Sequence, residues 1–349
     1  MPDVEVVLRE PDHDPEMFRL YREVFGEHAT QASLHRWSWQ FRENPAVEAT
    51  GPVVWMAREG DRLLGQMATM RVGLWFAGRE LQASFGNDYF VRLDAQGRGL
   101  GILLSNAWSD NEDVALALGL TPSSYPLFKK LGFKDVGPVP FFQKIVDPKA
   151  VARRRLGQLG ELAAPALDLG LRVRMGAPPE PPRDVEVKMS HAFGPEYDAL
   201  WARARASYVM SVRRDAAYLQ WKYVACPHRR YDLREARRGG TLVGYAVSRE
   251  QDYRGLTLGW IVDLFSDTRD EGAKDALIAD ILRTFREHGV ARAQAYTMNA
   301  PLAADLRRHG FFPGASAVQF CVRTCVDPQG AYEDLGGWNL MFGDGDLDR

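Results

Sequence analysis

Cysteine is scarce in this sequence, with only Cys226, Cys321 and Cys325 among 349 residues. So small and odd a number argues against a framework of disulfide bonds. Cys321 and Cys325 are separated by three residues, but no second pair of cysteine or histidine residues lies at the spacing of a zinc site. We therefore expect neither structural disulfides nor a metal.

Long apolar runs are absent as well. No stretch approaches the roughly 18 apolar residues that a membrane-spanning helix needs. The first residues, Met1 to Glu5, carry charge where a secretory signal would be apolar. The sequence therefore predicts a cytoplasmic protein with no membrane partner.

An excess of charge of one sign is the third absence, since 44 basic residues stand against 46 acidic ones. A balanced chain has no general electrostatic attraction for nucleic acid. The run Arg153-Arg154-Arg155 is short, and we interpret it as the solvated face of a helix. We expect no nucleic-acid partner.

The chain contains enough apolar residues, 46% of the total, for two globular domains at its length. Residues 14–25 show apolar side chains at helical spacing, whereas residues 53–68 are typical of a strand hairpin. Residues 114–118 predict a short buried strand. Strands interspersed with helices in this way indicate an α/β fold with a sheet of mixed direction.

A break in this pattern marks a domain boundary. It begins with a helical stretch and ends in Pro178-Pro179-Glu180-Pro181-Pro182, a semi-rigid spacer. The predicted organisation is an N-terminal domain over 1–146, a linker over 147–183, a C-terminal domain over 184–326 and a tail over 327–349.

Motifs of the first half recur in the second half in the same order, which indicates two copies of one fold. Each match is weak alone, but the offset between them is nearly constant. The pairs are Trp39-Gln40-Phe41 with Trp221-Lys222-Tyr223, Leu63-Leu64-Gly65-Gln66 with Leu242-Val243-Gly244-Tyr245, Asp88-Tyr89-Phe90 with Asp263-Leu264-Phe265, and Lys130-Leu131-Gly132-Phe133 with Arg308-His309-Gly310-Phe311.

The strongest local pattern is a strand that runs into Gln96-Gly97-Arg98-Gly99-Leu100-Gly101 and then directly into a helix. Alternating glycines let the backbone turn tightly and approach a ligand. The start of the helix adds unpaired N–H groups and a positive dipole end, which together suit a phosphate or pyrophosphate. A glycine turn that merely starts a helix and binds nothing is the alternative.

Other phosphate loops match less well. A dinucleotide fingerprint needs its third glycine at position 102, which is Ile102, and no Gly-Lys-Ser/Thr ending of a P-loop is present.

The loop resembles the Q/R-x-x-G-x-G/A motif of the GNAT acyltransferase superfamily. Phe128-Lys129-Lys130-Leu131-Gly132-Phe133 resembles that superfamily's second motif, a helix that ends in Gly-Phe. The resemblance covers residues 4–145 well and 185–325 more faintly. It implies two tandem GNAT-like domains, each a mixed, mostly antiparallel sheet flanked by helices, with the C-terminal copy degenerate.

The same resemblance implies how a cofactor would be held. The amides of Gln96, Gly97, Arg98, Gly99, Leu100 and Gly101 would wrap the pyrophosphate of acetyl-CoA or another acyl-CoA. The backbone of Val91, Arg92 and Leu93 would pair with the pantetheine arm. Phe128 would lie beside the same cofactor, and no metal is implied.

The catalytic residues are less well defined by the motifs. Many members of the superfamily open the second motif with a tyrosine that protonates the leaving thiolate, but this chain has Phe128 there. Tyr125, one helical turn earlier, is either that acid or an ordinary packing residue. Asp88 is either the general base or, because Asp263 repeats it, a structural carboxylate.

Three further interpretations concern the second half and the tail. The loop Glu271-Gly272-Ala273-Lys274-Asp275-Ala276 has lost two glycines and gained carboxylates, so we expect no cofactor there. Trp39 and Trp221 line an acceptor pocket or pack in the core. The acidic tail is disordered, or folds back toward a cationic acceptor.

The predicted activity is transfer of an acetyl or other acyl group from CoA to an amine of a small molecule or peptide. Two alternatives remain: a transferase that uses aminoacyl-tRNA or a long acyl chain, and a CoA-binding protein without catalysis. The intact pyrophosphate loop favours CoA over tRNA.

Overall fold

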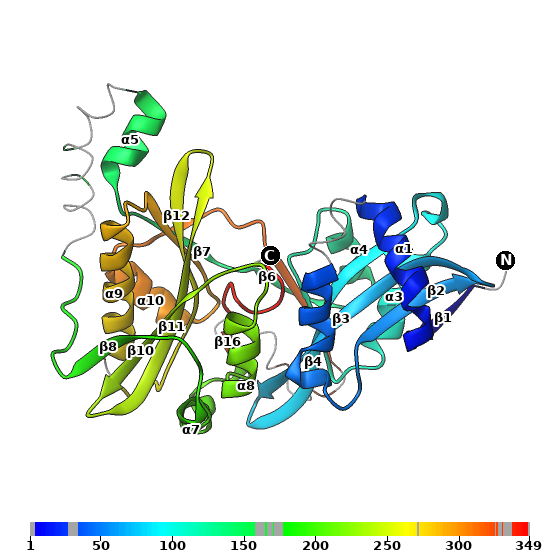
Figure 1. The fold of residues 1–349 in the computed structure, drawn as a ribbon, viewed down its shortest axis with the longest axis horizontal. Coiled ribbons are helices and arrows are strands. Elements are labelled where there is room, and N and C mark those ends of the chain that lie inside the picture. Colours follow the sequence, from blue (N-terminus) through cyan, green and yellow to red (C-terminus); the bar gives the residue numbers. More distant parts are fainter. Residues whose placement is uncertain are drawn as a thin grey trace.

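The computed structural model describes residues 4–26, 34–157, 165, 170, 177–270, 272–324, 326, 330 and 337–347. Two β-sheets stand side by side, each with helices packed against it (Figure 1). Both sheets are mostly antiparallel and mixed, so the predicted fold class is confirmed.

The first sheet follows the order β1-β2-β3-β4-β5-β15-β6, and its only parallel neighbours along this path are β4 and β5. A short pair, β9 and β16, extends it beside β3. Its strands are β1 (Val4–Leu8), β2 (Val53–Glu59), β3 (Arg62–Phe76), β4 (Arg79–Val91), β5 (Val114–Leu118), β6 (Lys134–Pro138), β9 (Met210–Val212), β15 (Gln319–Thr324) and β16 (Trp338–Asn339).

The second sheet has the corresponding order β8-β10-β11-β12-β13-β7-β14, again with one parallel pair, β12 and β13. Its strands are β7 (Phe141–Ile145), β8 (Val185–Ser190), β10 (Asp232–Arg238), β11 (Thr241–Tyr253), β12 (Leu256–Ser266), β13 (Arg292–Tyr296) and β14 (Phe312–Gly314).

The two halves exchange one strand each. β7 follows the first half in sequence but pairs with β13 and β14 of the second sheet, while β15 lies between β5 and β6 of the first sheet. The predicted boundaries at residues 146 and 184 stay a prediction. A division of the chain into domains by sequence position nevertheless differs from a division by sheet membership at β7 and β15.

Helices cover the sheets through apolar faces. In α1, the residues Met17, Leu20 and Tyr21 are buried against the first sheet, and α3 buries Leu104 and Trp108. The helices are α1 (Asp14–Phe25), α3 (Leu100–Ser109), α4 (Ser124–Lys130), α5 (Pro148–Leu156), α7 (Pro195–Ala204), α8 (Ala216–Leu219), α9 (Ala273–Glu287) and α10 (Ala300–Arg308).

Two π-helical turns, Ser38–Arg42 and Gln220–Val224, meet where the halves join. The Trp39 and Trp221 rings stack with centroids 5.1 Å apart. Each indole N–H donates to the other's backbone carbonyl, at 2.9 and 2.7 Å. Both side chains are buried, so they form part of the core and not an open aromatic pocket.

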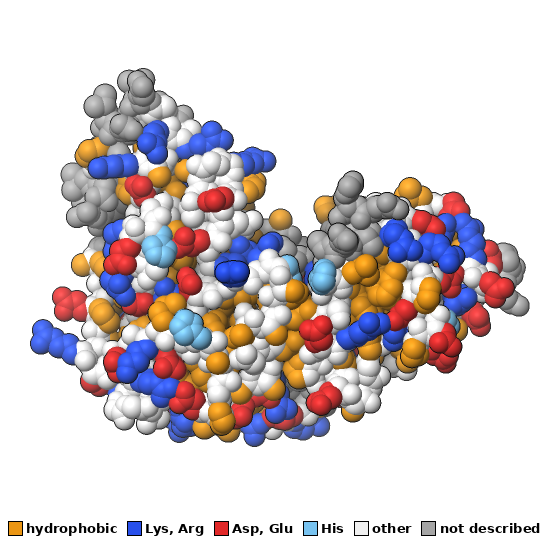
Figure 2. Space-filling model, viewed as in Figure 1, with side chains coloured by type: hydrophobic (Ala, Val, Ile, Leu, Met, Phe, Trp, Pro, Cys, Tyr) orange, Lys and Arg blue, Asp and Glu red, His pale blue; other side chains and the backbone are white. Residues whose placement is uncertain are grey.

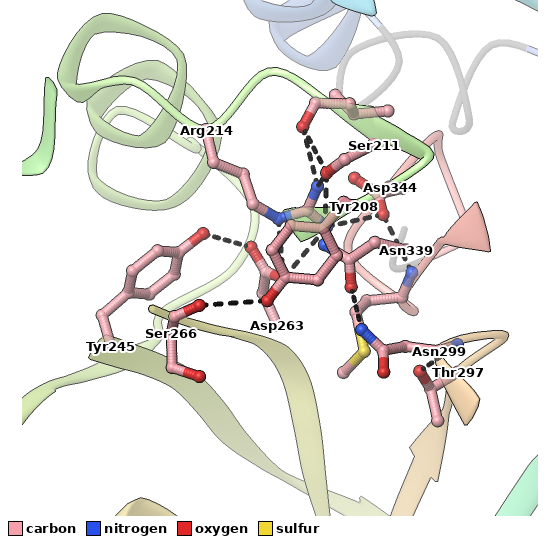
Figure 3. A network of polar contacts seen from close by, with 12 residues as sticks. Tyr208, Ser211, Arg214, Tyr245, Asp263, Ser266, Thr297, Asn299, Asn339 and Asp344 are labelled. Atoms are coloured by element: carbon pink, nitrogen blue, oxygen red, sulfur yellow. Dashed lines mark hydrogen bonds and ion pairs between the residues drawn. The ribbon is translucent and has the colours of Figure 1, made fainter. Parts of the chain in front are cut away.

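The tail over 337–347 folds back between the two halves, and Asp348 lies outside the described residues. Its Asp344 accepts a 2.8 Å hydrogen bond from Arg214, which also pairs with Asp263 of β12 at 3.2 Å (Figure 3). All three side chains are at most 1% exposed. The tail is therefore anchored by a buried ion-pair network.

Candidate active site

A cavity of about 510 Å³ opens where β4 and β5 diverge. The two strands pair only from Ala83 to Phe85 against Val114 to Leu116 and then separate. Its lining includes four residues predicted from the sequence, Asp88, Val91, Gln96 and Phe128. The divergence of two parallel strands therefore creates the opening beside the glycine loop.

The glycine loop has the geometry that its sequence predicts. Gly97 and Gly99 have φ values of 79° and 78°, a region that favours glycine, and Gly99 is the N-cap of α3. A Cβ atom at either position would meet nothing within 4 Å. In the described part of the chain, the N–H groups of residues 97–101 donate no hydrogen bond. These unpaired donors at a helix start fit a pyrophosphate.

Arg98 projects from this loop beside β2. Its guanidinium pairs with Glu59 at 2.5 Å, and its side chain remains one-third exposed. This ion pair holds the Arg98 guanidinium beside the glycine loop, where an anionic ligand would contact it.

Gly101 is required for a different reason, close packing. A Cβ atom there would lie 2.2 Å from the Tyr89 hydroxyl oxygen, and Tyr89 also lines the cavity. Burial raises the pKa of Tyr89, so this phenol stays protonated. The third glycine thus lets α3 approach β4.

We predict that Gly101→Ala lowers the free energy of unfolding by about 1–3 kcal/mol, because the new methyl group collides with Tyr89. Thermal or urea unfolding measures the loss. Adding Tyr89→Phe removes the hydroxyl and is expected to restore part of the stability. If the two substitutions change the free energy of unfolding additively in the double variant, this explanation is contradicted.

β4 ends at Val91, and a 3-10 turn over Leu93–Ala95 separates this strand from the glycine loop. Val91 pairs with Gly65, and the Arg92 N–H donates to the Leu64 carbonyl at 2.8 Å. The Arg92 side chain pairs with Glu23 at 2.6 Å, and Leu93 is 87% exposed. Val91 lines the cavity, whereas Arg92 and Leu93 do not.

Asp88 lies at an irregularity of β4 with φ 41° and is held from two sides. Arg36 pairs with it at 2.6 Å, and the Tyr21 hydroxyl donates to it at 2.6 Å. Burial and then the charge of Asp88 raise the pKa of Tyr21 well above its usual value. Burial opposes the charge of Arg36, but Asp88 outweighs this and raises the pKa of Arg36. These partners favour a structural carboxylate over a free base.

Tyr125 is not among the cavity-lining residues. Its hydroxyl donates to Asp135 of β6, which also accepts a 3.1 Å hydrogen bond from Lys129. This hydrogen bond, followed by burial, raises the pKa of Tyr125. The structure does not bring the predicted acid together with Asp88 and the loop.

Phe128 is 2% exposed and forms one wall of the cavity. Its ring packs edge-on against Phe133 and Tyr89, with centroids 4.9 and 6.3 Å apart. The residue that replaces the usual tyrosine is thus an apolar wall between α4 and the β4–β5 opening.

Tyr21, Arg36 and Leu347 belong to this site but were not predicted from the sequence. Asp346 belongs to the acidic tail, for which folding back toward a cationic acceptor was one of the two interpretations left open. Asp346 and Leu347 line the cavity, and the Asp346 charge contributes to raising the Arg36 pKa. Leu347 lies against Gly119, where a Cβ atom would be 2.7 Å from its methyl carbon. The repeated aspartates of the tail were the one available indication in the sequence.

The corresponding region of the second half is filled by the chain itself. A Cβ atom at Gly272 would lie 2.2 Å from Pro182 of the proline-rich segment, and Asp275 pairs with Arg308 and His309. Glu271 lies outside the described residues.

The tail occupies the opening beside β12. Gly343 donates to Val262 at 2.8 Å, Met298 donates to Leu340 at 3.0 Å, and Thr297 pairs with Met341. A segment of this chain therefore bridges the ends of β12 and β13, where the first half has its open cavity.

Two negative findings concern the described residues only. They contain no group of three or more His, Cys, Asp or Glu side chains that could hold a metal ion. None of their helices is both long and apolar enough to cross a bilayer. On the face in Figure 2, basic and acidic side chains are interspersed.

This chain, with a mixed sheet whose parallel central strands diverge beside a glycine loop and helix, has the fold of solved GCN5-related N-acetyltransferases. The sequence matches no family model and no curated protein. The likeness is therefore one of structure.

Three solved structures illustrate it. A GCN5-related N-acetyltransferase from Anabaena variabilis has a TM-score of 0.64 at 11% identity, over 92% of this chain and 73% of that one. Eis1 from Mycobacterium abscessus has a TM-score of 0.55 at 15% identity, with 92% and 73% covered. Saccharomyces cerevisiae N-myristoyltransferase, solved with myristoyl-CoA, has a TM-score of 0.55 at 12% identity, with 93% and 79% covered.

Proposed function

We propose that the chain is an acyltransferase that moves an acetyl or other acyl group from CoA to an amine, with its cofactor site in the first half. The observation that carries this proposal is the glycine loop at the edge of the β4–β5 cavity, because the N–H groups of residues 97–101, at the start of α3, donate no hydrogen bond. Acyl-CoA bound there would present its thioester carbon to an acceptor amine.

The residues of the chain would act mainly by binding and positioning. The amides of residues 97–101 hold the pyrophosphate, and Val91 guides the pantetheine arm into the cavity. The amine nitrogen bonds to the thioester carbon, the carbon–sulfur bond breaks, and the amine proton reaches the departing sulfur through solvent. Asp88, which forms an ion pair with Arg36, lines this cavity.

Thiol release from acetyl-CoA in the presence of an amine panel tests catalysis. Parallel reactions with longer acyl-CoA donors separate an acetyltransferase from a long-chain transferase. Tight CoA binding without thiol release across both series would favour the non-catalytic alternative. The supporting observations are Phe128 in the cavity wall and the hydrogen bond that Tyr125, which does not line the cavity, donates to Asp135.

One acyl-CoA per chain is the expected stoichiometry. Pro182 covers Gly272 in the second half, and the tail bridges the ends of β12 and β13. Calorimetric titration of the full chain with acetyl-CoA measures the number of sites. Two molecules bound per chain would refute the assignment of the second half as a cofactor-free copy.

Asp346 is our candidate for recognising a cationic acceptor, because it brings a carboxylate from the tail into the cavity. Asp346→Asn is expected to raise the KM for an amine acceptor roughly tenfold while acetyl-CoA affinity is kept. Initial-rate kinetics with each substrate varied separately measure both. A weakened acetyl-CoA affinity with an unchanged acceptor KM would contradict this role.

A further inference from the structure

A second cavity, of about 560 Å³, lies in the C-terminal half and shares no lining residue with the first. It lies where β8 ends, beside the loop that joins the π-helical turn Gln220–Val224 to β10. The function proposed above makes no use of it.

The lining of this cavity is basic. His191, His228, Arg229 and Arg230 contribute to it, and none of its lining residues is acidic. Asp232 is the nearest carboxylate in sequence, but it does not line the cavity. In a chain with slightly more acidic than basic residues, such a lining is not explained by overall composition.

Arg229 carries the most specific indication of a ligand. Its Nε is buried and has no hydrogen-bond partner, although its Nη1 donates to the His228 carbonyl at 3.2 Å. Within the described part of the chain, neither Arg229 nor Arg230 forms an ion pair. Leaving a buried guanidinium donor unpaired is costly, and a planar arginine fork matches carboxylate and phosphate oxygens.

The wall of this cavity is held firmly at the junction of the halves. The His228 ring packs edge-on against Trp39, with centroids 5.2 Å apart, and Trp39 is locked to Trp221 by stacking and reciprocal hydrogen bonds. The segment that presents Arg229 and Arg230 therefore adjoins a rigid part of the core.

We propose that the second cavity binds a small oxyanion, the phosphate or carboxylate group of a metabolite, with Arg229 as the main donor and Arg230 as a second cation. The Nε of Arg229, which has no hydrogen-bond partner in the structure, and a neighbouring guanidinium N–H would form charge-assisted hydrogen bonds with the oxyanion. The glycine loop is a separate anion site, so the two must be distinguished in solution.

Calorimetric titration of the full chain with inorganic phosphate and, separately, with malonate tests the proposal and distinguishes the two oxyanions. The double variant Arg229→Ala/Arg230→Ala is expected to weaken binding of the preferred anion at least about tenfold. Arg154→Ala/Arg286→Ala removes two exposed helical arginines elsewhere and should leave binding unchanged. Gly99→Val, which alters only the glycine loop, should also retain this binding.

Arg229→Lys is a second test that keeps the charge and the size of the side chain but removes the Nε donor. It should still weaken binding, and it replaces the double variant if that protein fails to fold by far-UV circular dichroism. The proposal is overturned if the wild type binds neither anion at millimolar concentration. It is equally overturned if removing Arg229 and Arg230 leaves binding unchanged while Gly99→Val abolishes it.

Discussion

Replacing Gly99 by valine should abolish acyl-CoA binding, with a loss of affinity of about a hundredfold or more, while the fold is retained. Gly99 has φ 78° and is the N-cap of α3. This backbone conformation is strongly unfavourable for a β-branched residue such as valine. The loop must then rearrange, and its N–H groups no longer converge on one pyrophosphate. Calorimetric titration with acetyl-CoA measures the loss.

Gly78→Val is the matched control. Gly78 lies in the β3–β4 turn with φ 87°, and a Cβ atom there also meets nothing within 4 Å, so the backbone strain is similar. This control should lose stability to a similar degree but keep its affinity for acetyl-CoA. If Gly99→Val binds acetyl-CoA as well as Gly78→Val does, the loop is not the cofactor site.

The second large effect concerns the buried network in Figure 3. Arg214→Met should lower the free energy of unfolding by about 3–5 kcal/mol, because it leaves Asp263 and Asp344 buried without their shared cation. Urea unfolding followed by tryptophan fluorescence measures it. The neighbouring Arg213 pairs with Asp215 at 2.5 Å but is 48% exposed, so Arg213→Met should cost at most about 1 kcal/mol.

The loss of unfolding free energy caused by Arg214→Met should also depend on pH. Burial raises the pKa of Asp344, and Arg214 opposes this increase. A carboxyl whose pKa is higher in the folded state stabilises the fold only while protonated, so its contribution is lost as pH rises through that pKa. Without Arg214 the pKa of Asp344 rises further. The difference in unfolding free energy between Arg214→Met and Arg213→Met should therefore be larger at pH 8 than at pH 5. A difference independent of pH would contradict this explanation.

Features that depend on neighbouring residues were predicted well from the sequence. The glycine loop, the strand before it and the helix after it follow from local rules of backbone conformation, and the structure has all three. The likeness between Trp39-Gln40-Phe41 and Trp221-Lys222-Tyr223 was also informative, since both segments form π-helical turns that meet each other.

Features that depend on distant residues were not predictable in the same way. The strand before the glycine loop was predicted, but the partners of its Asp88, Tyr21 and Arg36, lie 67 and 52 positions away. The spaced aspartates of the tail left two interpretations open, a disordered end and a segment that folds back toward a cationic acceptor. Burial of Asp344 becomes possible only because Arg214, 130 positions earlier, supplies a charge inside the core.

The exchange of β7 and β15 was beyond prediction for the same reason. Each is a short extended segment with no sequence feature that selects its sheet, and their partners are non-local.

This exchange has a consequence for synthesis on the ribosome. β5 and β6 emerge well before the strand that lies between them, Gln319–Thr324, because β8 to β14 are translated in between. The first half therefore waits with two unpaired strand edges, which are prone to wrong pairing, until β15 has emerged. The cavity is completed later still, because Asp346 and Leu347 of its lining follow β15 in the chain.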